Sequence, residues 1–376
     1  MKYFFIFLFV FLLNNKSAYP IDTKASQAIV IDFNTSEVLY KKKSELNTIP
    51  ASMTKIMTVY VVFDRIKNSN LSLEDICTVS PKSYKMGGSK MFLEINDKVS
   101  ILDLLKGIII HSGNDASVAI SECLSGTEES FAELMNIYGK KMNLMNTNFV
   151  NSSGWPNENH YSTVEDIAII SNNLIRDFPE LYKLFKETEY EYNNIKQPNR
   201  NFLLSNLIGT DGLKTGFTKK SGWGIALSTK RNNRRVTVVI NGSNSSRERA
   251  LEAEKLTNWA FRETNETILF KKNQIIKTVD VWLGSKSRIN LIIENDVKTI
   301  LSYEQIKSIS SEIEYTKPIP APLKKGDKLG EINISINGKD NMIIPLVSDK
   351  NVNSINPLFR IFFAAKYLIF GNSLNE

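Results

Sequence analysis

A serine and a lysine three positions apart stand inside an apolar segment of the chain. The segment opens at Pro50, contains Ser52 and Lys55, and continues through mostly apolar residues to Phe63. Positions i and i+3 share one face of a helix, so the Ser52 hydroxyl and the Lys55 amine can meet. A helix that is apolar nearly all round is buried, and burial disfavours an ammonium, so Lys55 can act as a base toward the serine. By spacing alone, an incidental serine beside a snorkelling lysine is the commoner outcome.

Two later triplets could complete a site around this serine. Ser-Gly-Asn at 112–114 stands at a predicted junction between two helices, where side chains can point into a cleft, and Lys-Thr-Gly at 214–216 opens a predicted strand. Each triplet alone is a weak signal, because Ser-x-Asn also occurs at 171–173 and 335–337. Their order after Ser52 favours one shared site with an activated serine nucleophile.

The elements that must position these residues can be predicted from periodicity and turn signals. A strand at 28–32 and a hairpin partner at 37–40 precede the helix that Pro50 opens. Further helices are predicted at 100–107, 116–124, 127–142, 162–176 and 247–262. An antiparallel sheet is predicted from strands at 214–217, 223–228 and 235–241. The stretch from 71 to 96 reads as irregular, and 193–201 reads as a polar connection.

Composition limits the classes of function that fit the chain. The net charge is +7, and the basic residues are scattered, so nucleic-acid binding is not indicated. Two histidines and two cysteines make no metal pattern, and neither a metal nor a cofactor is expected. The spacing of Cys77 and Cys123 does not show whether they pair, and Cys123 is expected in the core as part of the 116–124 helix.

The three motifs in this order resemble the penicilloyl-serine transferase group, which includes β-lactamases and penicillin-binding proteins. Gly-Leu-Lys-Thr-Gly at 212–216 and the helix ending at Arg262 are similar to the low-molecular-mass penicillin-binding proteins, the serine-type D-alanyl-D-alanine carboxypeptidases of peptidase family S11. The resemblance covers nearly all of the mature chain. It implies an α+β, β-lactamase-like catalytic domain, with an antiparallel sheet flanked by helices and an all-helical part.

The resemblance implies catalytic roles for four residues. Ser52 would attack the carbonyl between two terminal D-alanines and form an acyl-enzyme, with Lys55 as the proton acceptor. Ser112 would relay a proton to the leaving amine. Asn114 would hold either Lys55 or the substrate amide.

It also implies substrate-binding roles, which fall on Lys214, Thr215, Gly216, Phe217 and Arg249. The backbone N–H groups of Ser52 and Phe217 would stabilise the oxyanion, and Gly216 would let the substrate backbone lie along the strand edge. Lys214, Thr215 and Arg249 would bind the terminal carboxylate. Arg247 is the alternative candidate for the role of Arg249.

Two departures from related sequences bear on the activity. Phe217 follows the Lys-Thr-Gly triplet where histidine is common in relatives, which can alter the cleft edge or the deacylation rate. In the predicted helix at 162–176, Glu165 is followed at the fourth position by Ile169, so this helix carries no Glu-x-x-x-Asn. The glutamate that many β-lactamases use for deacylation is therefore missing, which argues against an efficient β-lactamase.

Domain boundaries follow from composition shifts along the chain. Residues 1–18 have a basic start, an apolar core and small residues, and read as a signal peptide, with a short retained anchor as the alternative. Residues 19–270 form the expected catalytic domain. β-type runs predict a small all-β domain at 271–350, and these runs are 278–283, 289–293, 330–336 and 341–347.

The last segment, 351–376, contains an aromatic and cationic stretch at 357–370 that suits an amphipathic helix at the membrane surface. The alternative is a terminal helix docked on the β domain. With the signal peptide, this places the chain in the periplasm or at the outer face of the cytoplasmic membrane, peripherally attached.

The function expected is removal of the terminal D-alanine from peptidoglycan stem pentapeptides, with acylation by β-lactams and a role in cell-wall maturation and cell shape. Two alternatives remain at this stage. One is a D,D-endopeptidase acting on peptide crosslinks, and the other is a β-lactam-binding sensor that does not turn over. The expected partners are stem peptides ending in D-Ala-D-Ala, β-lactams and the membrane surface.

Overall fold

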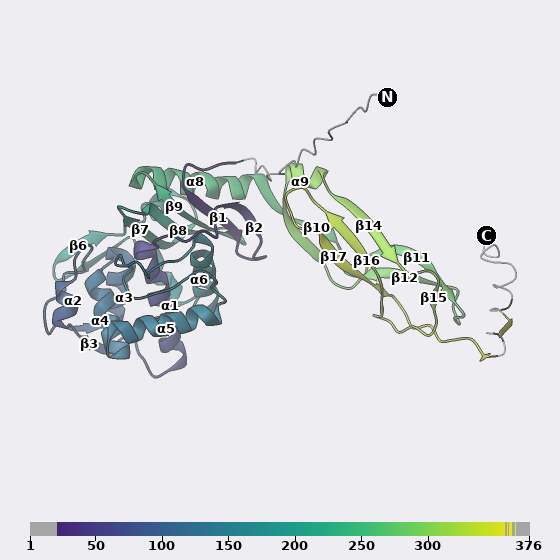
Figure 1. Cartoon of the computed structure of the whole chain (residues 1–376), viewed down its shortest axis with the longest axis horizontal. Helices are drawn as coiled ribbons and strands as arrows, with labels where there is room; N and C mark the ends of the chain where they lie inside the picture. The colour runs from purple at the N-terminus through teal and green to yellow at the C-terminus, as the bar shows by residue number, and fades with distance from the viewer. Residues whose placement is uncertain (1–20, 358, 360, 363–364, 366–376) are drawn as a thin grey trace, which may run out of the picture. The chain divides into compact units, whose positions relative to one another are not determined.

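The computed structural model describes residues 21–357, 359, 361, 362 and 365. Two compact units divide after Thr264 (Figure 1). The predicted signal peptide at 1–18 and most of the predicted tail helix within 351–376 lie outside the described residues. The division falls at 264 rather than at 270, because helix α8 (Ser246–Glu263) runs directly into strand β10 (Thr264–Phe270) without a loop.

A five-stranded antiparallel sheet forms the centre of the N-terminal unit, in the order β2-β1-β9-β8-β7. Its strands are β1 Gln27–Asp32, β2 Val38–Lys42, β7 Thr210–Thr218, β8 Gly222–Arg231 and β9 Arg234–Ser243. The run from Val236 to Ile240 is rich in β-branched residues, which favour strands, and it is buried between β1 and β8. The predicted hairpin and the three predicted later strands are confirmed, in one sheet.

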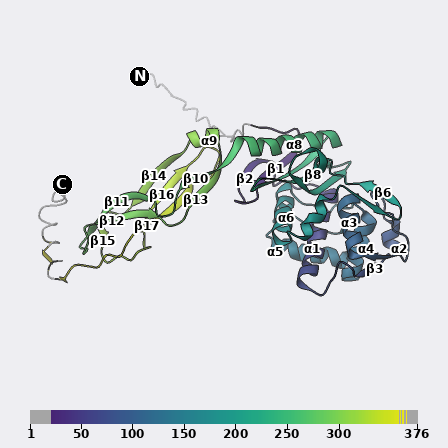
Figure 2. The ribbon, with the colours of Figure 1, turned by 180° about the vertical axis from the view of Figure 1, so that it is seen from behind.

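Helices cover both faces of this sheet. Helix α8 lies along one face and the helical part lies against the other (Figure 2). The longer elements of the helical part are α1 Lys55–Asn68, α3 Ile101–Lys106, α4 Asn114–Ser125, α5 Glu128–Lys141 and α6 Val164–Asp177. Helix α1 is buried at every position from Lys55 to Phe63, as its apolar sequence predicts. A 3₁₀ turn, η1 (Ala51–Thr54), precedes it and carries Ser52.

Several short elements complete the unit, and some were not expected. They are β3 Ile76–Thr78, α2 Pro81–Lys85, β4 Lys98–Ser100, the π-helical turn η2 Gly107–His111, η3 Leu181–Lys186, β5 Glu189–Tyr192, β6 Ile195–Pro198 and α7 Leu203–Asn206. The polar connection predicted at 193–201 is wrong in its first half. Asn193 and Asn194 both have positive φ, at 47° and 60°, and turn β5 into β6. Asparagine tolerates this conformation, so a tight hairpin forms without an apolar strand pattern.

The second unit is the predicted small all-β domain. Its elements are β10, β11 Ile275–Trp282, β12 Arg288–Ile293, β13 Val297–Ser302, α9 Tyr303–Lys307, β14 Ser310–Tyr315, β15 Ile319–Pro320, β16 Lys328–Ser335 and β17 Met342–Ser348. Six strands form one sheet, in the order β14-β16-β17-β12-β11-β15, and β10 pairs with β13. Its core is separate from that of the first unit and includes Ile289, Leu291, Ile334 and Leu346.

A disulfide joins Cys77 on β3 to Cys123 on α4, with Cα atoms 5.6 Å apart. The pairing, which the spacing had left open, is therefore present. The expectation that Cys123 lies in the core is wrong, because the last turn of α4 faces the surface β3–β4 ribbon and this residue is exposed. The bond closes a chain separation of 46 residues around the 112–114 triplet.

This disulfide predicts a measurable contribution to stability. Loop-closure entropy for a separation of 46 residues corresponds to about 4 kcal/mol, so Cys77→Ser should lower the free energy of unfolding by roughly 2–4 kcal/mol. Urea titration of the oxidised protein, followed by near-ultraviolet circular dichroism, measures this change. Cys123→Ser and the double variant should lose as much as Cys77→Ser, since any of the three opens the loop. Additive losses, or none, would contradict the loop-closure account.

Candidate active site

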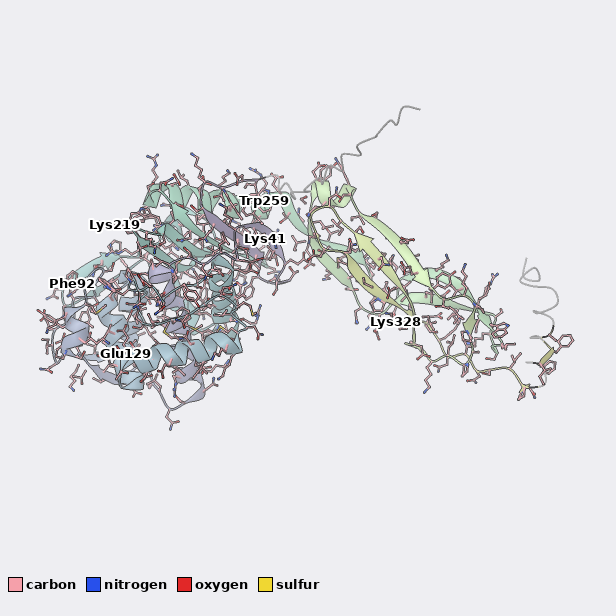
Figure 3. The ribbon with its side chains drawn as sticks, viewed as in Figure 1. Lys41, Phe92, Glu129, Lys219, Trp259 and Lys328 are labelled. Carbon is pink, nitrogen blue, oxygen red and sulfur yellow. A yellow bond between two sulfur atoms is a disulfide. The ribbon has the colours of Figure 1, made fainter. Side chains whose placement is uncertain are left out.

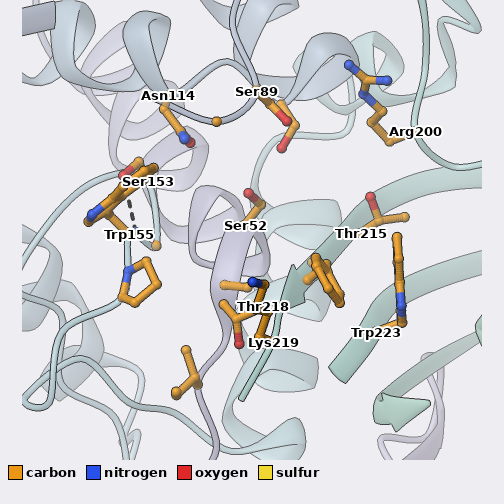
Figure 4. Close-up of a pocket in the computed structure, with 18 of the residues that line it drawn as sticks. Ser52, Ser89, Asn114, Ser153, Trp155, Arg200, Thr215, Thr218, Lys219 and Trp223 are labelled. Atoms are coloured by element: carbon orange, nitrogen blue, oxygen red, sulfur yellow. Dashed lines mark hydrogen bonds between the residues drawn. The ribbon is translucent and has the colours of Figure 1, made fainter. Parts of the chain in front are cut away.

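The serine and the lysine of the first motif are in contact. Lys55 Nζ lies 3.1 Å from Ser52 Oγ. The serine is held on the η1 turn, and the lysine is the first residue of α1, so their spacing of three residues brings the two side chains to one side. Lys55 is 0% exposed, and Ser52 lines a cleft with a volume of about 890 Å³ (Figure 4). The hydroxyl is therefore accessible from solvent, whereas the amine behind it is not.

Two further acceptors surround the lysine. Its Nζ donates to Asn114 Oδ1 at 2.8 Å and to the carbonyl oxygen of Ser153 at 2.6 Å. An ammonium has three protons and here meets three acceptors, so its donors are satisfied despite complete burial. The three acceptors come from segments that are far apart in the sequence. The amine position is therefore fixed by the fold.

Burial lowers the pKa of Lys55 to about 7. Asp115 and Glu128 oppose the shift, because their negative charges favour the ammonium. A lysine with this pKa is partly neutral near pH 7, and its lone pair can then accept the proton of the Ser52 hydroxyl. The environment thus supplies what the spacing alone could not establish, a base beside the serine.

The loop at 151–155 is a part of the site that sequence reasoning missed. Ser152 N–H and Oγ donate to Glu128 Oε1, at 3.1 and 2.9 Å. Asn151 Oδ1 accepts from the N–H groups of Gly154 and Trp155 at 2.8 and 3.0 Å. These contacts aim the Ser153 carbonyl at Lys55. The sequence analysis did not single out this loop, because a backbone carbonyl has no residue signature.

Gly154 occupies a position that no other residue can fill. Its φ is +78°, and a Cβ there would lie 1.9 Å from the carbonyl oxygen of Ala51, next to the nucleophile. The glycine therefore allows the 151–155 loop to pack against the turn that presents Ser52. Its place after Asn-Ser-Ser is the one sequence signal that could have drawn attention to this loop.

The second motif stands where two helical segments meet. Ser112 has a left-handed φ of 62° and ends the π-helical turn η2, and α4 starts at Asn114. The Asn114 side chain bridges Lys55 Nζ and, through Nδ2, the Gly87 carbonyl at 2.8 Å. Ser112 is 4% exposed and lines the cleft together with Ser52 and Asn114. The fold thus brings the first two motifs into one cleft.

The third motif forms the opposite wall of the cleft, on strand β7. Thr215, Gly216 and Phe217 line the cleft, and Lys214 lies buried on the same strand. Burial lowers the pKa of Lys214 well below its ordinary value, and nearby cations lower it further. A Cβ on Gly216 would approach the Pro50 carbonyl at 2.8 Å. The glycine therefore permits β7 to pack on the nucleophile turn, which is a different reason from the predicted passage of a substrate backbone.

Arg249 on α8 lies at one end of the cleft, and its rival Arg247 does not line it. The guanidinium of Arg249 stacks over Trp223 at 5.5 Å and donates to Ser246 Oγ at 3.1 Å. Burial lowers its pKa to about 10, so it remains charged near neutral pH. Phe217, which is 47% exposed, stacks on the same tryptophan with ring centroids 4.2 Å apart. The aromatic pair therefore supports the arginine.

A second arginine, Arg200, was missed by the sequence analysis. It lies across the cleft edge from Ser52 and near Thr215, and its backbone carbonyl contacts Arg249 Nη2 at 3.5 Å (Figure 4). It sits in the loop after β6, where no motif marks it. No aspartate or glutamate lines the cleft, so the described part of this surface carries only positive charge. In the described chain, no group of three His, Cys, Asp or Glu side chains is placed to hold a metal.

Two family profiles match the chain. One, described as D-alanyl-D-alanine carboxypeptidase of peptidase family S11, covers residues 14–245, and one described as the C-terminal domain of penicillin-binding protein 5 covers residues 265–354. The chain is 38% identical to D-alanyl-D-alanine carboxypeptidase DacC of Escherichia coli K12, over 86% of this chain and 83% of that protein. It is 35% identical to DacA of Haemophilus influenzae, over 85% and 83%.

Solved structures show the same likeness in three dimensions. The carboxypeptidase DacD from Francisella tularensis superposes with a TM-score of 0.79 at 27% identity, covering 89% of this chain and 95% of that one. Penicillin-binding protein 5 from Haemophilus influenzae gives 0.73 at 33% identity, with coverage of 90% and 100%. With the serine–lysine pair, the three motifs in one cleft and the β domain that follows, the chain belongs to the D-alanyl-D-alanine carboxypeptidases of serine peptidase family S11.

Proposed function

We propose that this protein is a serine D,D-carboxypeptidase that removes the terminal D-alanine from peptidoglycan stem pentapeptides and is also acylated by β-lactams. The observation that carries the proposal is the contact of Lys55 Nζ with Ser52 Oγ at 3.1 Å, with the lysine pKa at about 7. Membership of the S11 family supplies the substrate class. The β-lactam amide occupies the place of the scissile peptide bond in the same reaction.

Acylation follows from the positions of four groups. Neutral Lys55 takes the proton of Ser52 Oγ as that oxygen attacks the carbonyl carbon between the two D-alanines. The negative charge on the carbonyl oxygen is stabilised by the N–H groups of Ser52 and Phe217, which belong to two segments that pack together at Gly216 and Pro50. The C–N bond breaks as Lys55 returns its proton through the Ser112 hydroxyl to the departing amine of D-alanine, which leaves Lys55 neutral again. Water then attacks the ester and gives a proton to Lys55, and Lys55 passes that proton to Ser52 Oγ as the ester C–O bond breaks, which restores the serine.

Recognition of the terminal carboxylate uses the cationic end of the cleft. Arg249 keeps its charge, and Thr215 offers a hydroxyl on the adjacent strand. Lys214 lies buried behind them. A carboxylate is the only charge that a D-Ala-D-Ala terminus carries, so a cleft wall with cations and no acidic group suits it.

The site of action is proposed to be outside the cytoplasm, in the periplasm or at the outer face of the cytoplasmic membrane, where peptidoglycan is matured and cell shape is set. The amino-terminal pattern at 1–18 and the Cys77–Cys123 disulfide support export, because disulfides persist in oxidising compartments. The apolar and cationic residues at 357–370 support peripheral attachment to a membrane surface. In the described residues, no helix is long and apolar enough to cross a bilayer.

Replacing the nucleophile should remove both activities. Ser52→Ala should abolish release of D-alanine from a pentapeptide ending in D-Ala-D-Ala, and it should abolish the penicilloyl adduct seen by intact-protein mass spectrometry. Ser205→Ala, on an exposed serine of α7, is the matched control and should keep both. A wild-type protein that forms the adduct but releases no D-alanine would instead identify a β-lactam-binding sensor. Cleavage of dimeric muropeptides in preference to pentapeptide would identify an endopeptidase.

The acylation rate should depend on pH through the Lys55 pKa. Only the neutral amine is a base, so the second-order rate constant for benzylpenicillin should rise about tenfold per pH unit in acid and level off above the lysine pKa. The expected midpoint is near the pKa of about 7. Glu128→Gln removes a charge that favours the ammonium, so it should move the midpoint to lower pH. Stopped-flow acylation from pH 5 to 10 measures both, and a flat profile would exclude Lys55 as the base.

The carboxylate role of Arg249 can be separated from general effects on the cleft. Arg249→Gln should lower kcat/KM for a peptide with a free terminal carboxylate by about 10- to 100-fold, the range of a hydrogen bond to a charged group. The same peptide with a C-terminal amide should lose little, because it offers no charge there. Arg247→Gln is the matched control, as Arg247 is exposed and outside the cleft. Equal losses on both peptides would contradict a carboxylate contact.

A further inference from the structure

The cations that line the cleft lie on different sides of the nucleophile. Arg200 and Arg249 lie near Thr215, where the terminal carboxylate is proposed to bind. Lys219 and Lys220 line the same cleft from the turn that joins β7 to β8. Figure 4 shows Arg200 and Lys219 on different sides of Ser52. The single carboxylate of the terminal D-alanine gives a role to the arginine end of the cleft. It gives none to Lys219 and Lys220.

The turn that carries the two lysines has a fixed shape. Thr218 Oγ1 contacts Ser221 Oγ at 2.7 Å and accepts from Ser221 N–H at 3.0 Å. Pairing of β7 with β8 continues up to Thr218 opposite Gly222, which has a φ of +73° and closes the turn. The lysines therefore project from a braced hairpin at the end of the strand that forms the cleft wall.

Neither lysine is neutralised by the protein. Both are exposed, and among the described residues no ion pair or hydrogen bond of either ammonium is found. Lys219 lies at the outer surface of the first unit (Figure 3). No acidic residue lines the cleft either, so both ammonium groups are available to an anionic ligand.

The direction of the substrate places its acyl side beside this turn. In the proposed mechanism the terminal carboxylate binds near Thr215 and the scissile carbonyl binds at the Phe217 N–H, so the peptide would run antiparallel to β7. Its upstream residues then continue past Thr218 toward the turn. The third and second residues of a stem pentapeptide lie one and two residues upstream of the scissile carbonyl, about 3 and 7 Å along an extended chain. They therefore pass the end of β7 at Thr218, where Lys219 and Lys220 begin the turn.

We propose that Lys219 and Lys220 form an anion subsite for a free carboxylate on the acyl side of the stem peptide. This inference rests on the proposed carboxypeptidase function. The groups that fit are the side-chain carboxylate of a diamino acid at the third position and the α-carboxylate of a γ-linked glutamate at the second. A stem peptide with lysine at the third position would place its ammonium beside Lys219 and Lys220 and is therefore a poorer substrate. A stem peptide with both carboxylates amidated is also poorer, because it offers the two lysines no negative charge.

The test measures kcat/KM for D-alanine release by the full chain from matched pentapeptides. One carries both free carboxylates, two carry an amide at the second or the third position, and one carries both amides. The wild type should prefer the fully free peptide over the doubly amidated one by roughly five-fold at low salt, the scale of one or two exposed ion pairs. The preference should shrink in 0.5 M salt, because exposed charges are screened.

Lys219→Gln/Lys220→Gln should remove this preference by slowing the free peptide alone, with the doubly amidated peptide unchanged within about two-fold. Lys230→Gln is the matched control, an exposed lysine at the far end of β8, and it should keep the preference. The single amides show which carboxylate is read. Equal rates on all four peptides, or a preference that survives in the double variant, would overturn the subsite and leave the carboxypeptidase intact. No release from any peptide would overturn the proposed function itself.

Discussion

Burial of the Lys55 amine is the constraint on which the rest of the catalytic domain depends. A fully buried cation is tolerated only where its protons meet acceptors, and here the acceptors come from Ser52, Asn114 and Ser153. Two buried carboxylates brace the loops around these acceptors. Asp115 accepts from backbone N–H groups of the loop before β4, and Glu128 accepts from the 151–155 loop. The same two carboxylates partly offset the fall in the lysine pKa.

Close backbone packing around the nucleophile is the second requirement, and two glycines meet it. The carbonyls of Pro50 and Ala51, just before Ser52, face Gly216 and Gly154 across gaps that admit no Cβ. Ala51 itself has a φ of 50°, a conformation that costs free energy for a residue with a side chain. The sheet strand β7 and the 151–155 loop therefore hold the η1 turn between them in a strained shape. In this shape the turn exposes the Ser52 hydroxyl to the cleft, whereas the Lys55 amine remains buried from solvent.

The basic groups in and behind the cleft differ in how readily they carry a positive charge. The two lysines of the motifs are buried and weakly basic, whereas Arg249 keeps its charge beside Trp223. The cleft thus combines buried, weakly basic amines with a guanidinium that stays charged, because the environments of these groups differ. Among the described residues, no aspartate or glutamate lines the cleft, so its wall offers no carboxylate base for the second half-reaction.

The amino-acid sequence by itself determined the three motifs, the family they belong to, the buried helix α1, the main strands and the β domain, because periodicity and triplet order are local properties of the chain. Phe217 and Arg249, which the resemblance singled out, line the cleft. Only the tertiary structure decided that the Ser153 carbonyl, Glu128 and Arg200 join the site, that Cys77 pairs with Cys123, and that a polar hairpin forms at β5 and β6. These features involve a backbone carbonyl, side chains outside the motifs, and pairings between segments that are distant in the sequence. Three-dimensional packing selects such partners, and it leaves no regular pattern along the chain.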